Sequence, residues 1–77
     1  MTDEQRKLAR HALGMGGSRP GHRNYFCATP GTPADAAWAE MVRREMALLC
    51  RVPSEGLPYN TYAVAPGTAT ALLVGDL

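Results

Sequence analysis

The sequence predicts a small α+β domain, and three stretches carry that prediction. Residues 32–46 have the apolar spacing of an amphipathic helix, and residues 61–65 are β-branched and aromatic, as strands are. Residues 66–73 start with a proline and stop before a glycine, as a short helix does. The apolar content of 45% is enough for one core, so we expect a single domain over residues 1–77.

The first helix is expected to run from Asp3 to about Leu13. Thr2 and Gln5 have the spacing of a capping box, in which the threonine accepts from a free amide and the glutamine reaches back to the threonine amide. Gly14 suits the left-handed residue that ends many helices. The side expected to face the core contains Leu8, Ala9, Ala12 and Leu13.

A glycine-rich loop over residues 15–23 should lead into a short strand. The loop composition disfavours both helix and strand, and the aromatic residues that follow favour extended backbone. Alternation along the strand should place Tyr25 and Cys27 on one face and Phe26 and Ala28 on the other.

The central helix has the strongest signal in the chain. Thr32 can cap it, Pro33 suits its first position, and Asp35 stands where the return bond of a capping box is made. Its core-facing residues should be Trp38, Met41, Val42, Met46 and Leu49. Trp38 is expected to be largely buried against Leu8, Leu13, Phe26 and Tyr62 or Val64.

The run Ala47–Val52 fits either a last helical turn or a strand by periodicity alone. Turn-forming residues 53–60 follow it, so we expect this run and residues 61–65 to be the arms of a hairpin. A short helix over Pro66–Leu73 should then stop near Gly75. A helix, a two-stranded hairpin and a return helix in this order predict a winged-helix-like layout.

Several short stretches share a layout with known proteins: His11-Ala12-Leu13-Gly14, Arg23-Asn24-Tyr25-Phe26-Cys27-Ala28, Trp38 with Met41-Val42, and Tyr62-Ala63-Val64 with Gly67 and Ala71-Leu72. They resemble a group of small proteins encoded by bacteriophages and prophages, which carry similar HALG, RNYF and aromatic-x-V-T-x-x-G-x-x-A-L motifs. That group commonly has Gly-Leu where this chain has Glu45-Met46, and histidines where it has Pro30-Gly31-Thr32-Pro33. The resemblance implies a phage-related origin and a compact fold, but no activity and no histidine-based site.

Composition also limits the location and the partners. The net charge of +1 provides no global attraction to nucleic acid, although residues 5–34 hold five cations and no acid. No apolar run, Ala71–Val74 included, approaches the roughly 20 residues needed to cross a bilayer, and no apolar run at the N-terminus suggests a secretion signal. We expect a cytoplasmic protein in a host cell, with Cys27 and Cys50 reduced and buried in structural roles.

No catalytic residue, metal site or cofactor is predicted. His11, His22, Cys27 and Cys50 lack the close pairing of zinc ligands, and a Cys27–His22 pair has no third group to orient it. The Gly14–Gly17 stretch lacks the strand and the Gly-Lys-Ser/Thr ending of a phosphate loop. We therefore expect neither an enzyme nor a small-molecule substrate.

Two binding functions remain open. The first is a non-enzymatic nucleic-acid-binding or regulatory module, in which a winged-helix-like domain would present the central helix to a groove. Its candidate contacts are Arg43, Arg44, Arg51, Arg19 and Arg23, with Tyr25 as a stacking aromatic. The second is a protein–protein interaction module or a homodimeric phage accessory protein, paired through Ala71–Val74 with itself or with another phage protein.

Overall fold

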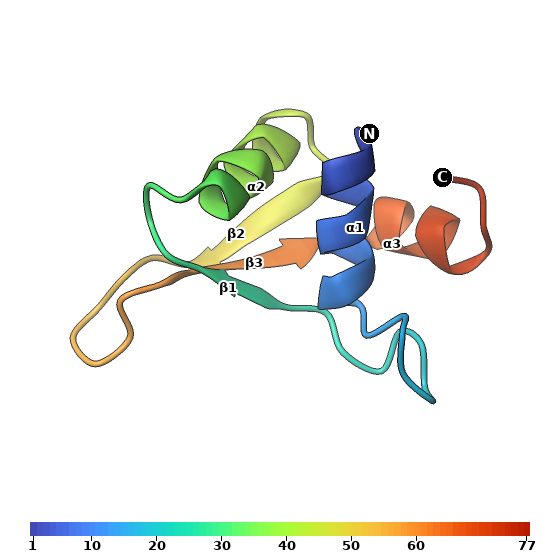
Figure 1. Ribbon diagram of the computed structural model, residues 1–77, viewed down its shortest axis with the longest axis horizontal. Helices are drawn as coiled ribbons and strands as arrows, with labels where there is room; N and C mark the ends of the chain where they lie inside the picture. The colour runs from blue at the N-terminus through green and yellow to red at the C-terminus, as the bar shows by residue number, and fades with distance from the viewer.

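The fold is described by a computed structural model covering residues 1–77. Three helices and three strands alternate along the chain (Figure 1). Their bounds are α1 Asp3–Ala12, β1 Phe26–Ala28, α2 Pro33–Arg43, β2 Ala47–Arg51, β3 Asn60–Val64 and α3 Pro66–Leu73. None of the helices is both long and apolar enough to cross a lipid bilayer.

The strands form one antiparallel sheet in the order β1-β3-β2. The central strand β3 places Tyr62 opposite Phe26 of β1 and opposite Leu49 of β2. The β2–β3 pairing shifts between Leu49 and Arg51, which leaves Cys50 as an extra, bulged residue. Because α2 leads directly into the β2–β3 hairpin and α3 follows it, the α+β, winged-helix-like layout expected from the sequence is confirmed.

The core lies where α1 and α2 cover one face of the sheet. Trp38 of α2 is fully buried, stacks on Tyr62 at a ring-centroid distance of 5.5 Å and contacts Phe26 at the same distance. These contacts confirm the burial expected for Trp38. The other buried apolar residues are Ala9, Ala12, Leu13, Ala28, Met41, Ala47, Val64 and Leu72.

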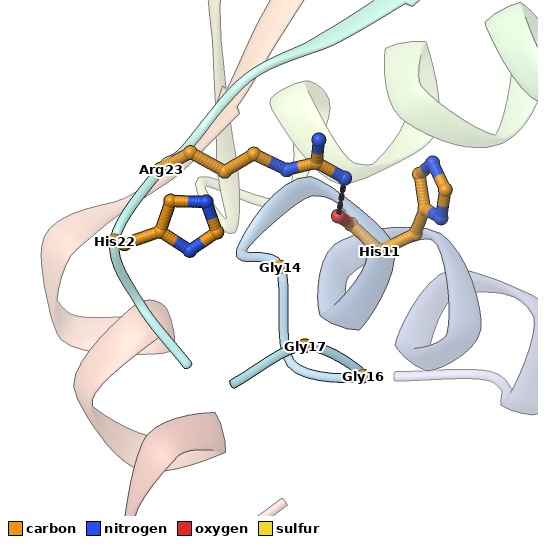
Figure 2. Close-up of a pocket in the computed structure, with 6 residues that line it drawn as sticks. All are labelled: His11, Gly14, Gly16, Gly17, His22 and Arg23. Carbon is orange, nitrogen blue, oxygen red and sulfur yellow. Dashed lines mark hydrogen bonds between the residues drawn. The ribbon is translucent and has the colours of Figure 1, made fainter. Parts of the chain in front are cut away.

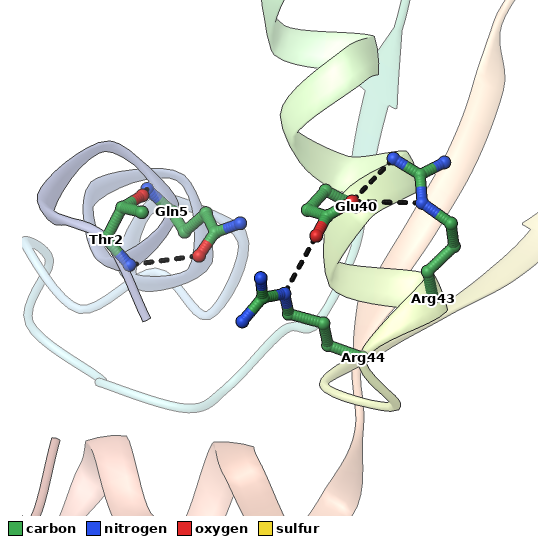
Figure 3. Close-up of polar contacts among 5 residues, drawn as sticks. All are labelled: Thr2, Gln5, Glu40, Arg43 and Arg44. Atoms are coloured by element: carbon green, nitrogen blue, oxygen red, sulfur yellow. Dashed lines mark hydrogen bonds and ion pairs between the residues drawn. The ribbon is translucent and has the colours of Figure 1, made fainter.

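Helix α1 begins as the sequence predicts. The Gln5 amide donates to Thr2 Oγ1 at 3.1 Å, and the Thr2 amide donates to Gln5 Oε1 at 2.9 Å (Figure 3). This reciprocal pair satisfies two amides that a helix start would otherwise leave free.

All three helices end in the same way, with a left-handed residue just past the cap. Gly14 ends α1 at φ 68° and Gly75 ends α3 at φ 84°. At the end of α2 this position is held by Glu45 at φ 61°, where the amides of Glu45 and Met46 donate to the carbonyls of Val42 and Met41. This is the Schellman motif, in which glycine is the usual residue.

Helix α2 is shorter than the apolar pattern predicts, since it ends at Arg43. Met46 and Leu49 therefore do not continue its buried face, and that part of the expectation is wrong. Met46 is half-buried in the connection, and Leu49 lies in β2 with 46% of its surface exposed. The ambiguous run after Met46 is a strand, and the expected hairpin is confirmed.

The Asp35 carboxylate does not accept a hydrogen bond from the Thr32 amide, as a capping box would require. It accepts hydrogen bonds from Asn60 Nδ2 at 2.9 Å and from Tyr62 Oη at 2.7 Å, and a longer one from the Gly31 amide. Thr32 still caps the helix by accepting from the Asp35 amide at 3.3 Å. The start of α2 is thereby tied to the middle strand of the sheet.

The two cysteines are exposed, so the expectation that they are buried is wrong. Alternation in β1 is as expected, but the face that carries Cys27 and Tyr25 is open to solvent. Cys27 Sγ contacts Thr61 Oγ1 at 3.7 Å across the β1–β3 pair. Cys50 is exposed because it is the bulged residue of an edge strand.

Candidate nucleic-acid interface

The cations at the end of α2 are both held by one carboxylate. Glu40 Oε2 accepts from Arg43 Nη2 at 2.6 Å and from Arg43 Nε at 2.9 Å, while Glu40 Oε1 accepts from Arg44 Nε at 2.8 Å (Figure 3). Hydrogen bonds from Arg44 and then Arg43 lower the pKa of the Glu40 carboxyl. This part of the helix therefore presents a partly neutralised surface.

The start of α2 offers little that could contact a base. Its exposed residues there are Pro33 and Ala36, which carry no side-chain donor. Asp35 has its carboxylate engaged with Asn60 and Tyr62. Since recognition helices contact base edges with polar side chains near their N-terminus, α2 lacks the groups that this role requires.

The cations without an ion pair gather elsewhere. Asp3 pairs with Arg6 at 2.8 Å, and Glu40 pairs with Arg43 and Arg44. No ion pair is made by Lys7, Arg10, Arg19, Arg23 or Arg51, and all of these except Arg51 belong to α1 or to the loop that follows it. We name Arg19, His22 and Arg23, in the loop that follows α1, the basic loop.

Backbone and side-chain hydrogen bonds hold the basic loop against α1. Arg23 Nη2 donates to the His11 carbonyl at 2.9 Å, and the Gly21 amide donates to the Leu13 carbonyl at 2.8 Å. His22 Nδ1 lies 2.6 Å from the Arg19 carbonyl. These bonds fix the path of a segment whose composition predicts only a loop.

The same segment is attached to the sheet by Asn24. Its Nδ2 donates to the Val64 carbonyl, and its Oδ1 accepts from the Val64 amide, both at 2.8 Å. A side-chain amide thus takes the place of a strand residue beside β3. With the Arg23–His11 bond and an edge contact of 5.7 Å between the His11 and Phe26 rings, the HALG and RNYF stretches form one structural unit.

A cleft of about 320 Å³ opens between α1 and the basic loop (Figure 2). Its walls contain no hydrophobic residue, and they are formed by His11, Gly14, Gly16, Gly17, His22 and Arg23. The His22 ring and the Arg23 guanidinium lie on one side and the glycine backbone on the other (Figure 2). The Arg23 guanidinium at this open, polar cleft can contact an anion.

An exposed aromatic ring adjoins this cleft. Tyr25 is 52% exposed, and Arg23 Cζ lies 5.7 Å from the centre of its ring. Such a ring can stack on an unpaired base while the neighbouring cation contacts phosphate.

The five predicted contact residues fall in separate places. Arg19 and Arg23 both belong to the loop between α1 and β1, whereas Arg43 and Arg44 lie at the C-terminal end of α2, away from this loop (Figure 1). Arg51 ends β2 where the hairpin loop begins. Arg10, in the same acid-free stretch, lies in α1 and does not line the cleft.

The histidines and cysteines are not assembled into a centre. No group of three or more His, Cys, Asp or Glu side chains is close enough to hold a metal ion. Comparison of the chain with family models, with curated proteins and with solved structures finds no match.

Proposed function

We propose that the protein binds single-stranded nucleic acid through the basic loop and Tyr25. The observation that carries the proposal is that Arg19 and Arg23 make no ion pair and that Arg23 lines the cleft, while Arg43 and Arg44 are held by Glu40. Phosphate contacts by Arg and Lys dominate the affinity of proteins for nucleic acid. The two arginines of the loop are free for such contacts, apart from the Arg23 bond to the His11 carbonyl.

The exposed ring of Tyr25 favours a single strand over a duplex. Proteins that bind single strands combine a cationic track with aromatic rings on which bases stack. A duplex would need a groove-reading element, and the exposed start of α2 has no donor for that purpose. The number of contacts is small, so the affinity should depend strongly on salt and weakly on sequence.

The phage or prophage origin and the host cytoplasm belong to the same proposal. The origin is supported by the resemblance of the HALG and RNYF stretches, which contact each other through Arg23 and His11. The location is supported by the two free thiols, because reducing compartments keep cysteines unpaired.

The test is a fluorescence anisotropy titration of labelled oligothymidine and of a duplex, from about 25 to about 300 mM salt. We expect the single strand to bind more tightly, with affinity falling as salt rises. The double variant R19A/R23A should lose about tenfold or more at low salt and give a shallower salt dependence, since two phosphate contacts are removed.

The matched control is R43A/R44A, which removes the same charge from residues already paired with Glu40. Its affinity should change much less than that of the loop variant. A third variant, Y25A, should weaken binding to the single strand only. Absence of binding at low salt, or equal losses in the two arginine variants, would reject the proposal.

A further inference from the structure

The free edge of β2 is an unusual surface for so small a protein. Apart from buried Ala47, every residue of this strand is exposed, and Leu48 has 51% of its surface in solvent. Val52 just beyond the strand is 60% exposed. An apolar edge strand presents unpaired backbone groups together with apolar side chains, which is the pattern that pairs with another strand.

The sheet pattern determines which backbone groups face that edge. The Asn24 side chain occupies both backbone groups of Val64 on the β1 side, so the Ala47–Val64 pair across β2 and β3 is not hydrogen-bonded. The Ala65 amide donates to the Met46 carbonyl, so the neighbouring pair, Met46 with Ala65, is hydrogen-bonded. Hydrogen-bonded and non-hydrogen-bonded pairs therefore alternate along β2 and β3. The amides and carbonyls of Ala47 and Leu49 therefore point away from β3, toward the free edge.

A second copy of the chain matches this edge. If two β2 strands pair antiparallel about a two-fold axis at Leu48, Ala47 of each copy is opposite Leu49 of the other. Those are the residues whose backbone groups face outward, so each of the two pairs can exchange two hydrogen bonds. The two Leu48 side chains then form the close, non-hydrogen-bonded pair at the axis.

Charges support the same register. Because Cys50 is an extra residue, this register places Arg51 of one copy at the level of Met46 of the other, next to Glu45, at each end of the pairing. Neither Arg51 nor Glu45 has an ion-pair partner within its own chain. Glu45 also stands at φ 61°, where the other two helices have glycine.

We infer that the protein forms a two-fold dimer through β2, with a continuous six-stranded sheet across the two copies. The bulge at Cys50 limits the pairing to the first part of the strand, and the interface is small. The dimer should therefore be in measurable equilibrium with the monomer. This surface is distinct from the basic loop and does not depend on nucleic-acid binding.

The test is sedimentation equilibrium of the full chain without nucleic acid, from about 1 µM to about 1 mM. We expect a concentration-dependent monomer–dimer equilibrium. L48E should weaken the dimer at least tenfold by placing two carboxylates at the axis, whereas V74E, which puts the same charge on an exposed residue outside β2, should not. Circular dichroism establishes that each variant is folded.

Arg51 and Glu45 of the two copies supply a second test, which can be done even if L48E does not fold. R51E and E45R should each weaken the dimer several-fold, and the double variant E45R/R51E should restore it, because the opposite charges are exchanged. E45G should raise the urea midpoint of unfolding while weakening the dimer. A strict monomer throughout, open-ended assembly, or no restoration in the double variant would overturn the inference.

Discussion

Tyr62 Oη donates a hydrogen bond of 2.7 Å to Asp35 Oδ1, while the Tyr62 ring stacks on Trp38. One residue of the central strand thus holds both the start and the middle of α2. Burial, and then the bond to Asp35, raise the pKa of Tyr62 to about 12. Hydrogen bonds from Asn60 and Tyr62 lower the pKa of Asp35.

Replacing Tyr62 by phenylalanine should lower the free energy of unfolding by about 1–2 kcal/mol, because a buried hydroxyl bonded to a carboxylate is lost while the ring stack is kept. Urea denaturation followed by Trp38 fluorescence measures the change. Tyr59→Phe is the control, since Tyr59 is exposed and makes no side-chain hydrogen bond. Equal effects of the two variants would contradict the assigned role of the bond.

Stability should fall at both extremes of pH. Asp35 and Glu40 have folded-state pKa values below their unfolded values, so their stabilisation is present above about pH 4 and is lost as the pH falls through the folded values. Tyr62 has a raised pKa, so the unfolded chain loses its proton first and stability declines from about pH 10 to 12. Urea midpoints across pH test this, and Tyr62→Phe should flatten the alkaline decline.

Asn24→Ala should destabilise the protein by about 1–3 kcal/mol, because both backbone groups of Val64 lose their partner at once. Asn24→Asp keeps the acceptor and loses the donor, so its effect should be intermediate. Chemical denaturation ranks the three proteins, and an alanine variant as stable as the parent would show that water replaces the side chain at no cost.

Gly14→Ala should cost about 1–2 kcal/mol and displace His22. Gly14 has φ 68°, and a Cβ there would lie 2.7 Å from His22 Cε1. The control is Gly16→Ala, because Gly16 has no atom within 4 Å of the added carbon and no left-handed backbone. Thermal unfolding measures stability, and the His22 ring resonances report its position. Equal stability losses and equal shifts of the His22 resonances in the two variants would contradict the role given to Gly14.

Both thiols should react with a disulfide reagent in the folded protein. Cys27 and Cys50 are exposed, and nothing in the fold covers them. We expect two equivalents to be modified rapidly without denaturant, as followed by absorbance. A rate that rises by orders of magnitude only in urea would mean that the thiols are protected.

The local features of this fold could be read from the sequence, whereas the long-range ones could not. The Thr2 and Thr32 caps and the end of α1 at Gly14 depend on neighbouring residues, and each was predicted. The bond from Tyr62 to Asp35 joins residues on different elements, so a helix-start pattern alone suggested the wrong partner.

The errors over the cysteines and Leu49 have one physical cause. Two helices cover only one face of a three-stranded sheet, and β2 extends beyond the covered area. An apolar residue type then says little about burial, because a chain this short cannot enclose all of its apolar side chains. For the candidate site, the acid-free stretch predicted Arg19 and Arg23, and the i, i+4 spacing predicts a Glu40–Arg44 pair, but only the structure reveals that Arg43 shares the same carboxylate.

The Asn24 bonds to Val64 and the Arg23 bond to the His11 carbonyl have a thermodynamic consequence for the loop between α1 and Arg23, which they anchor at its far end. Its backbone is ordered when the chain folds, so most of the conformational entropy is lost before any ligand arrives. Binding at the cleft then needs to restrict little more than the side chains of Arg19 and Tyr25. The loop is preorganised, and its few charges can act without the entropic penalty that a flexible basic segment incurs.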